Sequence, residues 1–310
     1  MITTVTLNTS VDKAYEINDT LECGSVMRVV KCRNTAGGKG LNVSRVIKVC
    51  GEDVQATGLI GGYTGKYFEE LLEKDGITNK FINVDAETRC CVNVLEKSGR
   101  STEFLELGNE VSKEDVDKFI EEFKVIIQES DVITLSGSVP KGIDSSIYKT
   151  LIDIAKGYNK KVILDTSGVY LEKGIEALPT MIKPNDEELS NLLNKKILSR
   201  DDVIEAGKNL FAKGIENVVI SLGKDGALLI CDEGIFHGIP PVINAVNTVG
   251  CGDSMVAGFA VSFERGYNNE EALRYAVSVS AANAMNKNTG DFNKEDFDYI
   301  FPKVVVNKIG

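Results

Sequence analysis

Short apolar runs and segments of helical periodicity alternate along most of the chain. Each apolar run is typical of a buried strand and ends in a small polar turn that contains glycine; the runs lie at 54–61, 132–138, 162–168 and 218–223. Apolar residues recur at helical spacing in the segment 116–127, and the chain from 252 to 301 is predicted to be helical. This alternation predicts an α/β fold with a mostly parallel sheet and helices on both faces. Ligands bind such sheets beyond the carboxyl ends of the strands, where the Ser, Thr, Asp and Gly residues fall.

Two segments, at about 13–36 and 86–107, break this rhythm. They contain short alternating stretches such as V-M-R-V-V-K-C and C-V-N-V-L, which indicate antiparallel strands without intervening helices. We expect them to form a small β-sheet that is inserted into the α/β body as a lid, and we expect residues 1–310 to form a single domain. An exposed lid sheet could pair with the lid of a second copy, which would give a homodimer.

The charge and residue counts exclude several classes of function. The 310 residues include 35 Lys and Arg against 46 Asp and Glu, a net charge of −11, and such a surface repels nucleic acids and anionic membranes. A phosphate ligand must therefore be held by a few local cations and backbone amides. Seven cysteines without a C-x-x-C pair, no apolar run of membrane-spanning length and no charged leader favour a reduced, cytoplasmic protein. The one histidine, His237, is expected to be a strand-edge residue without a catalytic role.

The string N-T-V-G-C-G-D-S at 247–254 is the strongest chemical feature. Gly250 and Gly252 leave the backbone bare, so the amides of Cys251, Gly252 and Asp253 can point off the start of the apolar helix that follows. Free N–H groups and the helix dipole attract anions there, which suits a phosphoryl group in transit. We expect the dipole to hold the Asp253 carboxylate ionised and able to accept a hydroxyl proton; a helix cap is an equally good interpretation. The Cys251 thiol, at a helix start, is expected to be reactive.

A second string, A-G-G-K-G-L-N-V-S-R at 36–45, places glycines before another predicted helix. Gly37 and Gly38 permit the close approach of a ligand, and Lys39 and Asn42 supply polar contacts. A tight turn with a solvated Lys39 would explain any one of these residues, but it explains the whole run less well.

A third string, K-P-N-D-E-E-L at 183–189, marks a turn into a helix and sets Asn185 and Glu188 one helical turn apart. This spacing can hold a hydrated magnesium ion through water, and taken alone it is more typical of a helix cap. Neither a P-loop nor a complete dinucleotide-binding glycine fingerprint occurs in the chain.

The strings G-G-K-G-L-N-V-S-R, N-D-E-E and T-V-G-C-G-D-S resemble the signatures of the ribokinase-like sugar kinases, also called the PfkB family. The resemblance extends from Asp12 in N-T-S-V-D to the final helices, and it implies a ribokinase-like fold and phosphorylation of a sugar by ATP with magnesium. It implies that Asp253 is the catalytic base, that Gly250 to Asp253 form an anion hole, and that Asn185 and Glu188 hold magnesium through water. It also implies a sugar site at Asp12, Gly37, Gly38, Lys39 and Asn42, an ATP site at Lys183, Ser221, Gly223 and Gly226, and a potassium site around Asn247, Val249, Asn283 and Asn286.

The chain departs from the common family string D-T-x-G-A-G-D at two positions. Asn247 replaces the first Asp, and the loss of this carboxylate weakens the implied potassium site. Cys251 replaces Ala but keeps the backbone amide, so the implied anion hole should survive.

Three cations, Arg28, Lys39 and Arg89, fall in or beside the predicted lid and pocket, and Ser138 is expected to add a contact. Arginine forks suit a phosphate dianion, so the sugar is expected to carry a phosphate already; a solvated surface position is the alternative for Arg28. The strings E-T-R-C-C-V-N-V-L, T-E-F-L-E-L-G and N-T-G-D-F are most similar to those of tagatose-6-phosphate kinases, which implies conversion of D-tagatose 6-phosphate to D-tagatose 1,6-bisphosphate. A 1-phosphofructokinase is the first alternative, and a non-catalytic sugar-phosphate sensor is an alternative of another class.

Overall fold

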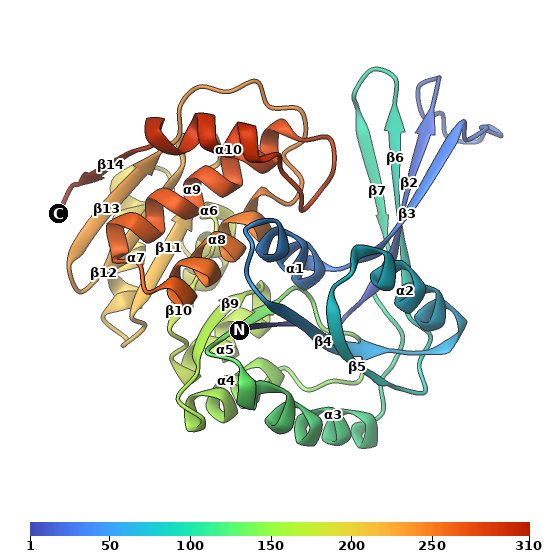
Figure 1. Ribbon diagram of the computed structural model, residues 1–310, viewed down its shortest axis with the longest axis horizontal. Helices are drawn as coiled ribbons and strands as arrows, with labels where there is room; N and C mark the ends of the chain where they lie inside the picture. The colour runs from blue at the N-terminus through green and yellow to red at the C-terminus, as the bar shows by residue number, and fades with distance from the viewer.

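The apolar runs form one large sheet in the computed structural model, which describes residues 1–310 (Figure 1). Neighbouring strands from β5 to β11 are parallel, and the remaining pairs at the other edge are antiparallel. The strands are, in spatial order, β14 (Val305–Lys308), β13 (Gly234–Ile239), β12 (Ala227–Cys231), β11 (Asn217–Ser221), β10 (Met181–Ile182), β9 (Lys161–Asp165), β8 (Val132–Ser136), β1 (Ile2–Thr6), β4 (Val54–Ile60) and β5 (Thr78–Asn83).

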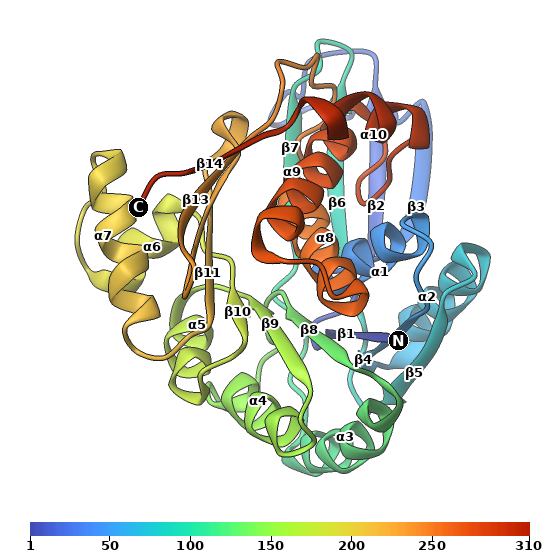
Figure 2. The same cartoon turned by 60° about the vertical axis from the view of Figure 1, so that its left-hand side comes forward.

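Helices cover both faces of this sheet, as the alternation predicts (Figures 1 and 2). One apolar core lies under α1 (Lys39–Val49), α2 (Gly62–Asp75), α8 (Cys251–Arg265), α9 (Asn269–Met285) and α10 (Lys294–Ile300). The other lies under α3 (Lys113–Ile126), α4 (Ile147–Gly157), α5 (Gly168–Gly174), α6 (Asp186–Leu193) and α7 (Arg200–Phe211). Short 3₁₀ turns complete the chain at η1 (Ile127–Glu129), η2 (Ile175–Ala177), η3 (Gly223–Asp225) and η4 (Phe301–Lys303). None of the helices combines the length and apolar character needed to cross a membrane.

The two segments that break the rhythm form a separate four-stranded sheet, which stands away from the large one (Figure 1). Its strands, in order, are β3 (Lys31–Gly37), β2 (Ser10–Ile17), β6 (Arg89–Glu96) and β7 (Ser101–Leu105). The expected antiparallel pairing is correct for the two outer pairs, but β2 and β6 in the centre are parallel. The central pair joins the two segments, since β2 belongs to the first and β6 to the second. β2 follows β1 and β6 follows β5, and because β1 and β5 run in the same direction in the large sheet, β2 and β6 also leave it in the same direction.

His237 is not at a sheet edge, as its sequence context had suggested. It lies within β13, between β12 and β14, and is buried. Its Nε2 is 2.9 Å from the carbonyl oxygen of Asp225, so the imidazole helps to hold the turn before β12. Burial lowers the pKa of His237, which favours the neutral ring.

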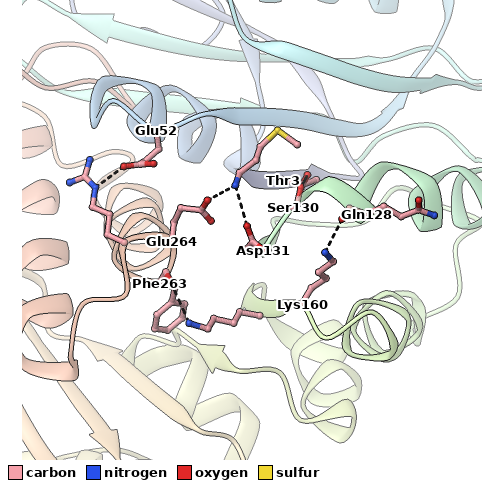
Figure 3. A network of polar contacts seen from close by, with 11 residues as sticks. Thr3, Glu52, Gln128, Ser130, Asp131, Lys160, Phe263 and Glu264 are labelled. Atoms are coloured by element: carbon pink, nitrogen blue, oxygen red, sulfur yellow. Dashed lines mark hydrogen bonds and ion pairs between the residues drawn. The ribbon is translucent and has the colours of Figure 1, made fainter.

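Helix α8 is fixed at both its side and its carboxyl end. Gly258 packs directly on Ala276 of α9, where an added Cβ would stand 2.5 Å from the Ala276 Cα. At the end of the helix, Glu264 pairs with the amino group of Met1 and Arg265 Nε donates to Glu52 Oε1 at 2.6 Å (Figure 3). These contacts lie at the amino ends of the central strands, so they hold the opposite end of α8 in place at the carboxyl ends.

We expect Gly258→Ala to lower the free energy of unfolding by about 1–3 kcal/mol, because the methyl group overpacks the α8–α9 contact. Urea titration followed by circular dichroism measures this change. Gly157→Ala is the matched control, since an added Cβ there meets nothing within 4 Å and alanine favours helix. Equal stability of the two variants would show that α8 and α9 can separate without loss.

Candidate active site

A large cleft lies at the carboxyl ends of the strands, between the two sheets. Most of the residues singled out from the sequence line it. They are Asp12, Gly38, Lys39, Asn42, Arg89, Ser138, Lys183, Asn185, Glu188, Ser221, Asn247, Val249, Gly250, Gly252 and Asp253. The structure thus brings together residues from seven separate stretches of the chain.

Other predicted residues do not reach the cleft wall. Arg28 lies exposed in the loop between β2 and β3, and it does not line the cleft. Gly37 is buried directly behind Asp12, where an alanine Cβ would stand 2.2 Å from the carboxyl group. Gly223 and Gly226 form the turn after β11, and Gly226 is pressed against the carbonyl oxygen of Gly238. These glycines and Arg28 do not line the cleft, and their direct contact with a ligand stays a prediction.

The first turn of α8 presents its backbone to the cleft. Gly250 precedes the helix with φ +81°, a left-handed conformation that glycine adopts without strain, and no side chain caps the helix. Asp253 is buried, and its Oδ2 accepts a hydrogen bond from Asn42 Nδ2 at 2.8 Å. The helix-cap interpretation of Asp253 is therefore wrong, because its carboxylate contacts α1 rather than the free amides of its own helix.

The protonation of Asp253 is set by more than the helix dipole. Burial raises the pKa of Asp253 above its ordinary value; Lys39 and the hydrogen bond from Asn42 oppose this, whereas nearby Asp165 adds to it. The prediction that the helix dipole holds this carboxylate ionised is therefore incomplete, because burial has the larger effect and favours the protonated form. A raised pKa makes the group a stronger proton acceptor once it is ionised, which is what a general base requires.

Asp165 is the functional residue that the sequence analysis missed. It ends β9 and is 1% exposed, with Oδ1 3.3 Å from Lys183 Nζ and Oδ2 3.5 Å from Lys39 Nζ. Burial acts to raise the pKa of Asp165, but Lys183 and Lys39 outweigh it, so the pKa lies below its ordinary value. Asp165 in turn raises the pKa of Lys39. The available signal was its place in V-I-L-D, where a carboxylate ends a buried strand.

The two lysines give this site its capacity for anions. Lys183 is buried, and its Nζ lies 3.3 Å from the point that a Cβ on Gly252 would occupy. Its ammonium group therefore faces the amides at the start of α8. Free backbone N–H groups, the positive end of a helix and two lysines together suit the charge that develops on a phosphoryl group.

Arg89 lies where the lid joins the body, near Asp12. It donates through Nε and Nη2 to the carbonyl oxygen of Asn8, at 3.3 and 3.1 Å, and through Nη1 to that of Glu106 at 2.7 Å. A guanidinium group has five N–H donors, so two remain for a ligand. Burial raises the pKa of Asp12, although a hydrogen bond from Ser10 and the charge of Arg89 oppose this.

Asn185 and Glu188 form a capping box at the start of α6. Asn185 N donates to Glu188 Oε2 at 2.9 Å, and Glu188 N donates to Asn185 Oδ1 at 2.8 Å. The cap interpretation is confirmed; Glu188 lines the cleft, and its Oε1 takes no part in the cap. No three His, Cys, Asp or Glu side chains gather to ligate a metal directly. The residues present therefore fit a magnesium ion held through its water molecules and not one bound directly by the protein.

The asparagine side chains of the implied potassium site accept hydrogen bonds from backbone amides close to them in the sequence. Asn283 Oδ1 accepts from the amides of Gly290 and Asp291, Asn286 Oδ1 accepts from Asn288 N, and Asn247 Oδ1 accepts from Val249 N. Each of these side-chain oxygens already accepts a hydrogen bond from a backbone amide, and the potassium site that the resemblance implies stays a prediction. They shape the loop after α9, where Thr289 packs against Gly250.

The Cys251 thiol does not fit the expectation of high reactivity. Its Sγ is 3.4 Å from Asn283 Nδ2, and burial raises the pKa of the thiol. A raised pKa lowers the fraction of thiolate, which is the reactive form.

The fold and this anion site define a phosphotransferase of small molecules, and comparison with known proteins gives the family. Residues 5–296 match the model of the pfkB family carbohydrate kinases, and the chain belongs to this family. A protein of Staphylococcus aureus provisionally named a phosphofructokinase is 33% identical, with TM-score 0.85, over 99% of this chain and 98% of that one. Phosphofructokinase-2 of Escherichia coli, solved in complex with potassium, is 28% identical with TM-score 0.93, over 97% and 98% of the chains. A Thermotoga maritima protein provisionally named a 1-phosphofructokinase is 26% identical with TM-score 0.90, over both whole chains.

The match confirms the predicted ribokinase-like fold and the prediction of an ATP-dependent sugar kinase. Kinases of this family use ATP and magnesium.

We expect Asp165→Asn to lower the free energy of unfolding by about 3–5 kcal/mol at neutral pH, because it leaves Lys183 buried without a counter-charge. The folded-state pKa of Asp165 is lowered, so its stabilising contribution is present at neutral pH and is lost as the pH falls through that pKa. The difference between wild type and variant should therefore shrink below about pH 4, near the ordinary aspartate pKa. Urea titrations at several pH values measure it.

Asp131→Asn is the control, since that carboxylate is 75% exposed although it also pairs with a cation. It should leave stability nearly unchanged. A stable Asp165→Asn protein at neutral pH would contradict the assigned role of the buried carboxylate.

Proposed function

We propose that the chain transfers the terminal phosphoryl group of ATP to a ketose phosphate, and that this acceptor is D-tagatose 6-phosphate, which becomes D-tagatose 1,6-bisphosphate. The observation that carries the reaction type is the grouping at the start of α8. There the buried Asp253 lies beside the free helix amides and beside Lys39 and Lys183, which Asp165 holds in place. A proton acceptor and a cluster of positive groups are thus next to each other.

Each group has a distinct part in the proposed reaction. The acceptor hydroxyl donates its proton to Asp253 Oδ1 as the bond from the hydroxyl oxygen to phosphorus forms and the bond to the leaving ADP breaks. The amides of Gly252 and Asp253, which have no partner in the protein, and the Lys183 ammonium stabilise the charge on the phosphoryl oxygens. Magnesium, when bound, would neutralise the ATP phosphates, and Glu188 Oε1 and Asn185 would hold it through its waters. The lid shields the site from water, which limits hydrolysis of ATP.

Arg89 supports an acceptor that already carries a phosphate. Its guanidinium group is half-buried, is oriented by two backbone carbonyls and keeps two donors free beside Asp12. A neutral sugar offers hydroxyl groups that do not need such a cation, whereas a phosphate dianion matches the fork. The choice of tagatose 6-phosphate rests on the resemblance of the strings around Arg89 and in N-T-G-D-F.

A fructose phosphate is the second candidate acceptor. It is favoured by the names of the related structures, which include phosphofructokinase-2 in complex with fructose 6-phosphate and a provisional 1-phosphofructokinase. A non-catalytic sensor is disfavoured, because Asp253 and both glycines of the anion hole are present and correctly arranged.

We expect ATP-dependent release of ADP with tagatose 6-phosphate, at a higher kcat/KM than with fructose 1-phosphate, fructose 6-phosphate or the free sugars. Asp253→Asn should keep the fold and lower kcat by about 10²–10⁴-fold, since asparagine cannot accept the proton. A coupled assay and circular dichroism measure the two effects. Asp296→Asn, in the first turn of α10 outside the cleft, is the control.

The outcomes separate the parts of the proposal. Preference for a fructose phosphate would keep the mechanism and replace the acceptor. Turnover by Asp253→Asn would overturn the base assignment, and no ADP release with any acceptor would favour the sensor.

We also propose that the lid forms a homodimer. Leu105 and Val30 line the cleft-facing side of the lid and are 62% and 56% exposed. Leu105 is in register with the buried Cys91 and, one strand further, with Asp12, so an exposed apolar side chain lies in the same row as the proposed sugar site. The outer strands β3 and β7 each have a free edge. A second lid could cover both features, and Escherichia coli phosphofructokinase-2 has a tetrameric inhibited form.

Leu105→Lys should convert the protein from two chains to one in sedimentation velocity, because an unpaired charge is costly to bury between two lids. Leu198→Lys is the control, since Leu198 is 83% exposed but lies far from the lid, before α7. A wild-type monomer, or a Leu105→Lys dimer, would contradict the proposed interface.

A further inference from the structure

Arg45 on α1 is the centre of a group of contacts in the wall of the cleft. Its Nε donates to Asp75 Oδ2 at 2.8 Å, its Nη1 donates to Asn42 Oδ1 at 3.2 Å, and its Nη2 donates to the carbonyl oxygen of Ala36. The side chain thus joins the end of α2, the lid strand β3 and the first turn of its own helix. It makes no contact with Asp253, which lies beyond Asn42.

The contact with Arg45 decides how the Asn42 amide is oriented. A guanidinium group only donates, so the oxygen of the Asn42 amide must face Arg45. An ionised carboxylate only accepts, so the Asn42 nitrogen must face Asp253, where Nδ2 lies 2.8 Å from Oδ2. The two neighbours therefore require the same orientation of the amide.

The backbone also fixes Asn42 in place. Gly290 has φ +68°, and a Cβ at this position would stand 2.9 Å from the Asn42 Cα. The loop after α9 therefore packs directly on the backbone of Asn42. The amide keeps one freedom, a half-turn that would exchange its oxygen and nitrogen.

We propose that Arg45 is a positioning residue for phosphoryl transfer, which prevents this half-turn and keeps the Asn42 amide donating to Oδ2 of Asp253. The inference rests on the proposed role of Asp253 as the base. With Oδ2 occupied, Oδ1 accepts no hydrogen bond from the protein and is left for the acceptor hydroxyl. Without Arg45, the amide oxygen could turn toward Asp253 and accept a hydrogen bond from the protonated carboxylic acid, a form that cannot act as a base.

The proton balance of Asp253 gives a readout that a merely structural contact would not affect. The charged groups that act on it are Lys39 from α1, Asp165 from β9 and Lys183 after β10, and the Asn42 hydrogen bond favours its ionised form. Loss of that hydrogen bond leaves the other three in place. The acidic limb of the pH profile of kcat should then move to higher pH.

The test is a double-mutant cycle of Arg45→Met and Asn42→Ala, assayed with ATP and whichever sugar phosphate gives turnover in the substrate panel. Arg45→Met alone should lower kcat by about 10- to 100-fold, the size of a lost hydrogen bond to a charged group, and move the acidic limb upward. In the Asn42→Ala background the same change should lower kcat by less than about threefold, since its target is gone. Additive losses, or an unmoved acidic limb, would overturn the inference.

Two further variants guard against a general loss of structure. Asp75→Asn leaves Arg45 in place but weakens its anchor, and it should give a smaller loss of kcat with a shift of the limb in the same direction. Arg274→Met removes an arginine that likewise joins a carboxylate, Glu270, to a backbone carbonyl, that of Val304. It should change the melting temperature without moving the pH profile. A shifted limb in Arg274→Met would show that the shift reports stability alone.

The result also separates this inference from the proposed function. Additive losses together with an inactive Asp253→Asn would remove only the role of Arg45. Turnover by Asp253→Asn, or a wild type inactive with every acceptor, would remove both.

Discussion

The carboxylate of Asp165 lies between two lysines that approach it from different parts of the chain. Lys183 follows β10, the neighbour of β9 in the sheet, whereas Lys39 begins α1 on one face. Both ammonium groups face the amino end of α8, which is itself positive. Without the carboxylate these like charges would repel one another in a partly dry site. The buried negative charge of Asp165 therefore allows two lysines and the positive end of a helix to gather at one place. There they can stabilise the negative charge of an incoming phosphoryl group.

Most of the fold could be predicted from the sequence, because the signals for strands and helices are local. The runs at 54–61, 132–138 and 218–223 became β4, β8 and β11, each within a few residues. The pairing of β2 with β6 could not be predicted in this way. Strand direction in the lid depends on how two distant segments meet, and alternation within either segment carries no information about that.

The site shows the same division between local and distant information. Glycines before helices pointed to Gly38 and Gly250, since a bare backbone at a helix start has few structural explanations. Asp165 was missed because one acidic residue at a strand end resembles any polar turn residue until its lysines are known. The spacing of Asn185 and Glu188 fitted both a helix cap and a metal site, and the structure shows the cap while leaving one carboxylate oxygen for the second role.

The lid is connected to the body more closely than its separate sheet suggests. Arg33 in β3 donates to Asn288 Oδ1 in the loop after α9, and the same loop packs on both Asn42 and Gly250. A movement of the lid would therefore displace this loop, and with it its contacts at the start of α1 and at the start of α8. Binding of the sugar and alignment of the base can be coupled through these contacts without any change in the large sheet.

The way in which the chain builds the lid also restricts its evolution and its engineering. The central strands β2 and β6 come from segments between which the chain returns to the body to make α1, β4, α2 and β5. One insertion could therefore not add the whole lid, and one deletion could not remove it. A chimera that exchanges lids between two such kinases must be spliced at both ends of both segments, and an ancestor with half of this lid would have exposed β2 or β6 as an unpaired edge.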